Sequence, residues 1–377
     1  MGITTKGNGR VVFGPRNPPP SPLFKMTIDT TQAGSASDTF VLPLALGTTN
    51  MTVYWGDGNS DIITTYNQAE LTHIYTVSGS YQISCDGSFG GVYFANLGDR
   101  RKVTSIDNWG TNQWVSMQFA FYGCQNMVAN YTDSPNTSNV TSMERMFFNC
   151  ILFNGVIDFD GTSLLTTKLM FINTSVMNSP VTITNTTLLT DCTSMFGQMN
   201  VFNQPITLDT TSVVDMTNMF SYCRQFNSAV NFSDTSNVTS MAGMFFTCLV
   251  FDQPVNFDTS SVLNMASMFY QCRAFNQVVN FDTSNVGSMF AMFFNCFVFN
   301  QDISSFNITN MTSAASMFLG SAFSTTNYNL LLPAWDTYGT SNVPFHAGTA
   351  HYSAGAPTTA HNAMIARGWT ITDGGTP

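Results

Sequence analysis

The most regular feature of the sequence is a Met-Phe pair that returns at nearly constant spacing. The pair occurs at Met146-Phe147, Met170-Phe171, Met195-Phe196, Met219-Phe220, Met244-Phe245, Met268-Phe269, Met292-Phe293 and Met317-Phe318, with Ala120-Phe121 as a degenerate first copy. Successive phenylalanines of this series are 24 to 26 residues apart. A fixed period of this kind is typical of a solenoid, in which similar structural units stack along one axis.

Other positions keep the same register relative to the phenylalanine of each copy. Four residues before it stands usually methionine, seven before it usually valine, and six after it an aromatic residue or methionine. Strand segments such as 237–241 and 253–257 are therefore expected to pair in parallel with their counterparts in the neighbouring units. Because one unit cannot cover its own apolar side, each turn must be buried by the turns above and below it.

The length of the period narrows the fold class. Helical-hairpin repeats need about 33 residues or more, whereas leucine-rich repeats have periods of about 20 to 29 residues. We predict a mainly β chain in which residues 99–330 form a leucine-rich-repeat-like solenoid of about nine turns of 24 to 25 residues. Residues 331–377 are predicted to form a C-terminal cap, in which a short helix over Thr358–Arg367 covers the last turn.

Residues 24–98, ahead of the repeats, follow a two-residue alternation of apolar and polar positions. The alternation is clear at Met51, Val53 and Trp55 and is interrupted by Gly, Asp and Asn turns. It predicts a small antiparallel β-sandwich.

Residues 1–23 are rich in proline, which favours an extended and semi-rigid segment. Two interpretations of this segment stay open. It is a linker or tail, or it is an arm that docks onto a partner subunit.

The repeat unit is nearly complete from Asp234 to Gln253, as Asp-Thr-Ser-Asn-Val-Thr-Ser-Met-x-x-Met-Phe-x-x-Cys-x-x-Phe followed by Asp-Gln. This unit resembles the BspA-type leucine-rich repeat of bacterial surface lipoproteins, a Mycoplasma-lipoprotein-type repeat that also occurs in phage and large-virus proteins. The resemblance covers about residues 100 to 330. It implies a solenoid with a display or adhesion role, and it implies no catalytic residues.

Two segments of residues 24–98 resemble a PKD-type immunoglobulin-like domain, as found in phage structural proteins and bacterial adhesins. They are Val53-Tyr54-Trp55-Gly56-Asp57-Gly58 and the stretch from His73 to Ile83. Asp57 is a conceivable metal ligand, but its place between two glycines favours a turn residue. His73 is interpreted as a strand residue rather than a catalyst.

The amino-acid composition argues against several classes of binding partner. Only 9% of the residues are charged, against roughly 25% in an ordinary soluble domain, and the net charge is −10. The chain has no cluster of Lys and Arg, so nucleic acid and anionic membrane surfaces are not expected as partners. It also has no run of 18 apolar residues, so membrane insertion is not expected.

Eight cysteines raise the question of disulfides or a metal site. Six of them stand three residues after a repeat phenylalanine: Cys124, Cys150, Cys223, Cys248, Cys272 and Cys296. Thr174, Met199 and Ser321 take that place in other copies, and no histidine accompanies it. This pattern favours a column of buried thiols over a metal ladder or disulfide staples. Cys192 takes a methionine position of the core, and the 22 methionines are likewise interpreted as core residues.

No arrangement of residues points to catalysis. The four histidines, His73, His346, His351 and His361, are scattered, and no nucleophile elbow, phosphate loop or zinc spacing is present. The repeated acids Asp234, Asp258 and Asp282 stand before Thr-Ser and are expected to form turns. We therefore predict no enzyme, no catalytic, cofactor-binding or metal-binding residue, and no cofactor, and leave the ligand-binding residues undetermined.

The sequence favours a phage virion structural protein at the virion surface, such as a tail fibre, a spike or a head fibre or decoration component. The start of the sequence lacks the apolar run of a secretory signal, and a particle assembled in the host cytoplasm needs none. Expected partners are other virion subunits, bound through the N-terminal region, and a host cell-surface glycan or protein. Homo-oligomerisation is left open. The alternatives are an adhesin at the bacterial cell surface and a carbohydrate-binding module.

Overall fold

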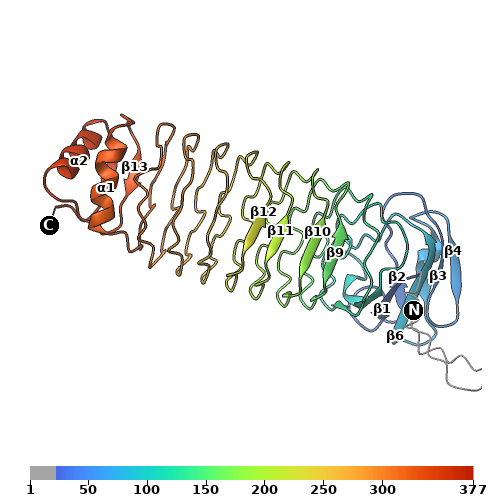
Figure 1. The fold of residues 1–377 in the computed structure, drawn as a ribbon. Helices are drawn as coiled ribbons and strands as arrows, with labels where there is room; N and C mark the ends of the chain where they lie inside the picture. Colours follow the sequence, from blue (N-terminus) through green and yellow to red (C-terminus); the bar gives the residue numbers. More distant parts are fainter. Residues whose placement is uncertain (1–22, 377) are drawn as a thin grey trace, which may run out of the picture.

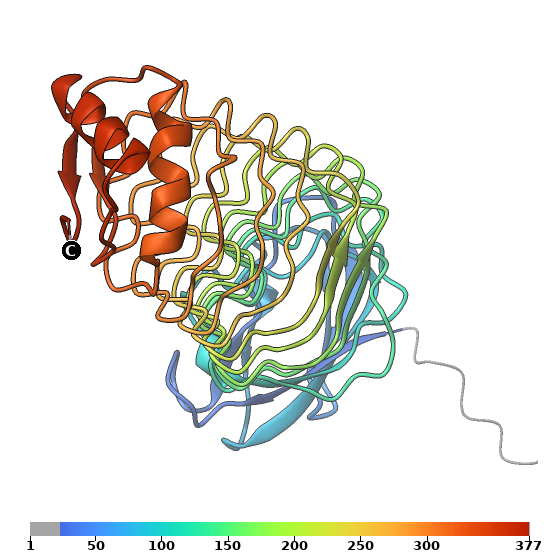
Figure 2. The same cartoon turned by 60° about the vertical axis from the view of Figure 1, so that its left-hand side comes forward.

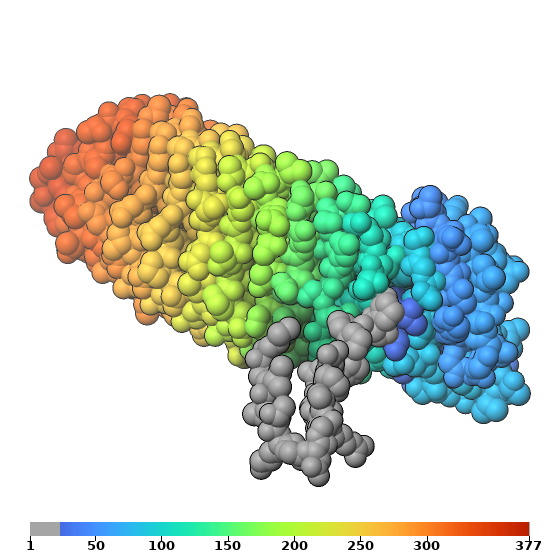
Figure 3. All heavy atoms as spheres, turned by 45° about the vertical axis from the view of Figure 1, so that its right-hand side comes forward, coloured from blue at the N-terminus to red at the C-terminus, as the bar shows by residue number. Residues whose placement is uncertain are grey.

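The computed structural model describes residues 23–376 as an elongated rod, with a β-rich module at one end and two helices at the other (Figure 1). Between these ends the chain winds through stacked turns that lie side by side along the rod (Figure 2). In the space-filling view the turns make one continuous body (Figure 3). The mainly β solenoid predicted from the repeat is confirmed. The arm predicted for residues 1–23 lies, apart from its last residue, outside the described residues.

The N-terminal module contains a six-stranded sheet in the order β4-β3-β6-β1-β7-β8, and a two-stranded sheet of β2 and β5. The strands are β1 (Phe24–Asp29), β2 (Thr39–Val41), β3 (Asn50–Tyr54), β4 (Ser60–Ile63), β5 (Thr72–Ile74), β6 (Ser80–Ser88), β7 (Val103–Asn108) and β8 (Val128–Ala129). Two 3₁₀ turns, Ala69–Leu71 and Arg100–Lys102, precede β5 and β7. The large sheet is antiparallel as far as β7, whereas β7 and β8 run parallel.

One sheet therefore joins the module to the solenoid. Strand β7 pairs with β1 on one side and, on the other, with β8, which lies within the predicted solenoid range. The buried Lys102 reinforces the junction, because its ammonium donates to the carbonyls of Ala36 and Thr39 at 2.7 Å. The neighbouring Asp99 accepts from the N–H of Val41, also at 2.7 Å. Strands from both sides of the predicted boundary between residues 98 and 99 share this sheet, and the domain boundaries themselves remain predictions.

Backbone hydrogen bonds define the number of turns. In each copy of the repeat the N–H of the phenylalanine donates to the carbonyl just before the phenylalanine of the next copy, with N···O distances of 2.9 to 3.0 Å. The same ladder continues at both ends, from Phe94 to Ala120 and from Phe318 to His346. The solenoid therefore has about 11 turns. The prediction of about nine was wrong because the turns around Phe94 and Phe345 lack the Met-Phe pair and are recognised only by their pairing.

The repeat phenylalanines form a single stack inside the rod, which we call the Phe ladder. Its members are Phe121, Phe147, Phe171, Phe196, Phe220, Phe245, Phe269, Phe293 and Phe318. Neighbouring rings lie 5.2 to 5.8 Å apart and within 13° of parallel. All nine are completely buried and belong to one hydrophobic core that extends from Phe24 in β1 to Trp369 near the end of the chain.

A second strand column runs along the rod, but it is hydrogen-bonded only in part. Its strands are β9 (Ile157–Asp160), β10 (Val181–Thr184), β11 (Ile206–Leu208) and β12 (Val230–Phe232). Strand β9 pairs with β10 and β11 with β12, both in parallel. The parallel pairing expected for 237–241 is confirmed at Ser240, which bridges to Asp215 and Asn264.

The pairing expected for 253–257 is wrong, because within the described chain this segment forms no strand. The rings of Phe232 and Phe257 lie 5.6 Å apart. Strand β11 places Leu208 against Phe232 and a backbone ladder forms, whereas Phe257 stacks on Phe232 with no backbone hydrogen bond between these segments of the described chain.

The C-terminal end of the rod is closed by helices α1 (Thr325–Asp336) and α2 (Ala356–Ala366) and by the parallel pair β13 (Pro344–His346) and β14 (Thr370–Thr372). The helix predicted over Thr358–Arg367 is confirmed as α2. Helix α1 was not predicted. Its buried residues Tyr328, Leu331, Leu332 and Trp335 have the i, i+3, i+4, i+7 spacing of an amphipathic helix, so the signal was present in the sequence.

We expect Phe245→Asp to destabilise the whole array, because it places a carboxylate in a buried ring stack. Losing the ring alone costs about 3 to 5 kcal/mol. Thermal unfolding followed by circular dichroism measures the effect. The matched control is Phe290→Asp, at a phenylalanine that is 46% exposed, which should melt like the wild type. Equal melting curves for both variants would contradict the assigned register.

Candidate functional site

The first place to look for function is the set of polar columns created by stacking. One column, which we call the Asn ladder, stands seven residues after the repeat phenylalanine: Asn154, Asn178, Asn203, Asn227, Asp252, Asn276 and Asn300. Each side-chain oxygen accepts the backbone N–H of the equivalent residue in the next turn, at 2.8 to 3.0 Å. The ladder fixes the register between turns, and its polar atoms are thereby used for structure.

The repeated acids serve turns, as predicted. Asp234, Asp258 and Asp282 each accept the N–H of the serine two residues later, at 2.8 to 2.9 Å. That bond is also the main cause of the lowered pKa of Asp258. The threonine that follows each of them is buried and donates to a carbonyl of the next turn at 2.8 to 2.9 Å. The aspartate column is therefore part of the backbone scaffold.

The cysteine column has the same structural role. The thiols of Cys150, Cys223, Cys248, Cys272 and Cys296 donate to the phenylalanine carbonyl of the preceding turn, with S···O distances of 2.9 to 3.0 Å. The hydroxyl of Thr174 makes the equivalent bond at 3.1 Å, which explains why threonine replaces cysteine in that turn. All eight cysteines are buried and free, so the predicted column of buried thiols is confirmed.

The pair formed by Asp57 and His73 is the most site-like feature of the N-terminal module. Asp57 accepts the N–H of Asn59 at 3.0 Å, which confirms its predicted turn role, and His73 lies in β5. The two side chains are also paired, with Nε2···Oδ2 at 2.9 Å, and the imidazole stacks on Trp55 at 4.8 Å. Burial opposes ionisation, but the bonds from His73 and Asn59 hold the pKa of Asp57 below its ordinary value.

The other histidines are far from this pair along the chain, in the C-terminal cap. His346 lies in β13, where its Nδ1 accepts the N–H of Gly348 and burial lowers its pKa. His361 stacks on Tyr352 and lies 3.3 Å from Asp373. Within residues 23–376 no group of three or more His, Cys, Asp or Glu side chains is placed to hold a metal ion. No helix in the same range is long and apolar enough to span a membrane.

The outer surface carries a partial column of rings, directly after the phenylalanines of the Phe ladder. This outer ring column consists of Tyr122, Phe148, Phe246, Tyr270 and Phe294. Phe246, Tyr270 and Phe294 stack face to face with ring centroids 4.5 Å apart. Because their faces cover one another, they offer edges rather than open faces to a ligand. The column is interrupted at Ile172, Gly197 and Ser221.

A polar hollow of about 330 Å³ lies beside this interruption. It is lined by Asn173, Gln198, Asn200, Tyr222 and Arg224, which come from three successive turns. Sequence reasoning missed it, because the residues that line it are separated by about one or two repeat lengths. The available signal was the break in the outer ring column.

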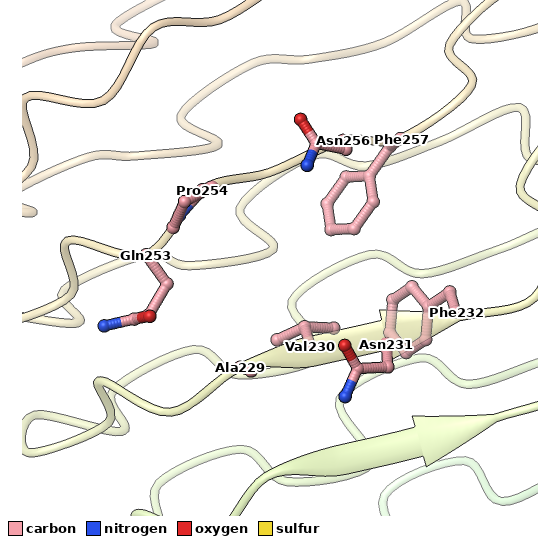
Figure 4. Close-up of a pocket in the computed structure, with 8 residues that line it drawn as sticks. All are labelled: Ala229, Val230, Asn231, Phe232, Gln253, Pro254, Asn256 and Phe257. Atoms are coloured by element: carbon pink, nitrogen blue, oxygen red, sulfur yellow. The ribbon is translucent and has the colours of Figure 1, made fainter.

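A second hollow, of about 380 Å³, opens on the other strand column between β12 and residues 253–257. Figure 4 shows the rings of Phe232 and Phe257 side by side and the side chain of Gln253 at the far end of the opening. Among the described residues, no backbone hydrogen bond joins β12 to residues 253–257. No charged side chain lines this opening.

Fold and surface together define a repeat solenoid whose repeated polar groups hold one turn to the next. The family model described as "Mycoplasma protein of unknown function, DUF285" matches residues 92–209, 190–280 and 255–351. These matches span more than half of the chain, so the chain belongs to this family. A search of curated proteins and a search of solved structures each found no match.

We expect Asn227→Ala to destabilise the rod by about 1 to 3 kcal/mol, because two hydrogen bonds of roughly 1 kcal/mol each are lost. The Asn227 oxygen accepts both the Asp252 N–H and the Gln253 side-chain amide. Chemical denaturation measures the loss. Asn231→Ala is the control, since the exposed Asn231 side chain makes no hydrogen bond in the described chain and should leave stability unchanged. A smaller loss at Asn227 than at Asn231 would refute the register role.

The buried thiols predict a loss of stability in alkaline solution. Burial raises the pKa of Cys223 from 9.0 to about 12, so between these values the unfolded chain binds fewer protons than the native one. Stability is therefore intact below pH 9.0 and falls above it, by up to about 1.4 kcal/mol per pH unit for each such thiol. Denaturation curves up to about pH 11 measure this slope. Cys223→Thr, which copies Thr174, should show a shallower slope, and an identical slope would refute the assignment.

Proposed function

We propose that this protein is a non-enzymatic display and attachment rod at the virion surface of a phage, as a tail fibre, a spike or a head fibre or decoration component. The observation that carries the proposal is the use of the repeated polar residues. Asparagine, threonine, aspartate and cysteine are bonded to neighbouring turns or to their own turn throughout the solenoid. The repeat therefore provides a rigid support, and recognition is left to the outer side chains that differ from turn to turn.

The same observation argues against catalysis. The repeated carboxylates accept backbone N–H groups at turns, and burial keeps the thiols protonated because it raises their pKa. A nucleophile or general base needs a neighbouring group to activate it and a reachable substrate. In the described part of the chain the Asp57–His73 pair packs against Trp55 and Tyr75, with both side chains largely covered. Its position supports a structural role in an immunoglobulin-like domain of the PKD type.

The junction between module and solenoid supports an anchoring role for the N-terminal region. The shared sheet and the buried Lys102 leave no flexible linker between the two parts. A partner subunit that binds the module would therefore also orient the rod. We propose that other virion subunits bind this end through the sandwich and the proline-rich arm, and that the solenoid points outward to a host glycan or protein. We do not expect nucleic acid binding or membrane insertion.

A specific finding favours a second candidate, an adhesin at a bacterial cell surface. The family is described from Mycoplasma proteins, and these are proteins of a cellular organism. The first candidate is supported by the eight free thiols, which suit folding and assembly in a reducing cytoplasm. Both candidates share the non-enzymatic rod and its attachment role.

Electron microscopy with a gold-labelled antibody against the solenoid tests the location. We expect gold on tails or heads of purified particles from the culture that produces the protein. The control is the same antibody blocked with an excess of purified protein. Gold confined to the envelope of uninfected cells would overturn the virion assignment in favour of the adhesin. Attachment is measured separately, as binding of beads coated with the purified protein to host cells.

A further inference from the structure

We propose that the hollow beside Tyr222 and Arg224 is a binding site for one acidic sugar residue, a monosaccharide unit that carries a carboxylate. This inference rests on the proposed attachment function and specifies the chemistry that would be recognised. The site belongs to the solenoid surface, at the interruption of the outer ring column.

The hollow lies in the turns where the chain omits the outer rings that other turns supply. In three turns the residue after the ladder phenylalanine is Phe246, Tyr270 or Phe294, and these rings fill the surface with a close stack. In the turns at Phe196 and Phe220 the same place is taken by Gly197 and Ser221. The hollow of about 330 Å³ is lined by residues that follow these places in the same turns, and its volume is within the range of small-ligand sites.

Tyr222 is held beside this space in a backbone conformation that its side chain does not favour. Its φ is 61°, and the equivalent position in other turns is occupied by Asn149, Asn173, Gln198, Thr247, Gln271, Asn295 or Gly320. A bulky residue in this left-handed region is uncommon and costs stability. The ring is 40% exposed, and it ends the outer stack at an angle of 57° to Phe246.

Arg224 supplies the charge that selects the ligand. The chain has only 12 Lys and Arg residues and a net charge of −10, so an arginine that lines a surface hollow is unusual in this protein. Within the described residues no carboxylate lies within ion-pairing distance of Arg224. Arg273 stands at the equivalent place two turns on, where its guanidinium covers the ring of Phe297 at 5.3 Å. One arginine therefore packs on the protein itself, and the other is available to a carboxylate.

The remaining lining residues suit hydroxyl groups. Gln198 and Asn200 are exposed, and in the described chain their side chains make no hydrogen bond. The side-chain amide N–H of Asn173 donates to Asn149 at 2.9 Å, and in the described chain its side-chain oxygen accepts no hydrogen bond. Amides that can both donate and accept match the hydroxyls of a sugar, while an aromatic ring contacts its apolar face. A guanidinium, a ring and three amides around one small space select a sugar with a carboxylate.

The experiment uses the full-length protein and two simple glycosides, methyl β-D-glucuronide and its neutral counterpart methyl β-D-glucoside. Saturation-transfer NMR and titration should show binding of the glucuronide with a Kd of about 1 mM, and binding of the glucoside at least about tenfold weaker. Added salt should weaken binding of the glucuronide, because an exposed ion pair is screened.

Three variants test the assignment to this hollow. Arg224→Gln should weaken glucuronide binding about tenfold, to the level of the glucoside. Asn200→Ala should weaken binding by removing one of the lining amides, and its melting temperature shows whether it is folded. Tyr222→Asn should weaken binding and raise the melting temperature, since asparagine suits the left-handed backbone. The matched control, Arg273→Gln, should bind like the wild type.

The outcomes separate this proposal from the proposed function. Equal binding of the two glycosides, or unchanged binding in Arg224→Gln, would overturn the acidic-sugar site. If wild-type and Arg224→Gln beads attach to host cells equally well, the attachment function stands and this site is not its basis. If glucuronide binds as expected but wild-type beads attach to no host cell, the site stands and the attachment function fails.

Discussion

The structure depends on one constraint, which is that every turn is covered only by its neighbours. A ring such as Phe245 is buried because Phe220 and Phe269 stack on its two faces, 5.6 and 5.7 Å away. A stack of this kind has two ends, and each end would expose apolar surface without a different element to close it. The six-stranded sheet closes one end and helix α1 the other, so all parts of the rod share one core.

The same constraint governs the polar residues. A turn that is buried between two others must satisfy its backbone groups across the interface, and the Asn ladder, the threonines and the cysteines do so at identical places in successive turns. Cysteine and threonine are interchangeable there because either can donate one hydrogen bond to the same carbonyl. The repeated residues are therefore those that make the same hydrogen bond in every turn. Residues outside these columns can differ from turn to turn.

Departures from the repeat consequently carry most of the information about function. Tyr222 and Arg224 change nothing in the ladders, since Tyr222 still donates its N–H to the carbonyl of Phe246 at 2.7 Å. They change the surface alone. The opening at Phe257 is different, because there no backbone hydrogen bond of the described chain joins β12 to residues 253–257. The two hollows have distinct origins, and only the first unites a charge, a ring and amides.

The sequence by itself determined the period, the inward side of each turn, the buried cysteines and the aspartate turns, because these follow from local spacing and from residues that must be covered. It did not reveal the turns around Phe94 and Phe345, which lack the motif and exist through backbone pairing. The shared sheet of β1, β7 and β8 and the hollow at Tyr222 were likewise decided only by the tertiary structure. The physical reason is the same in each case: which residues meet across about 24 positions of chain depends on the exact winding of every turn between them.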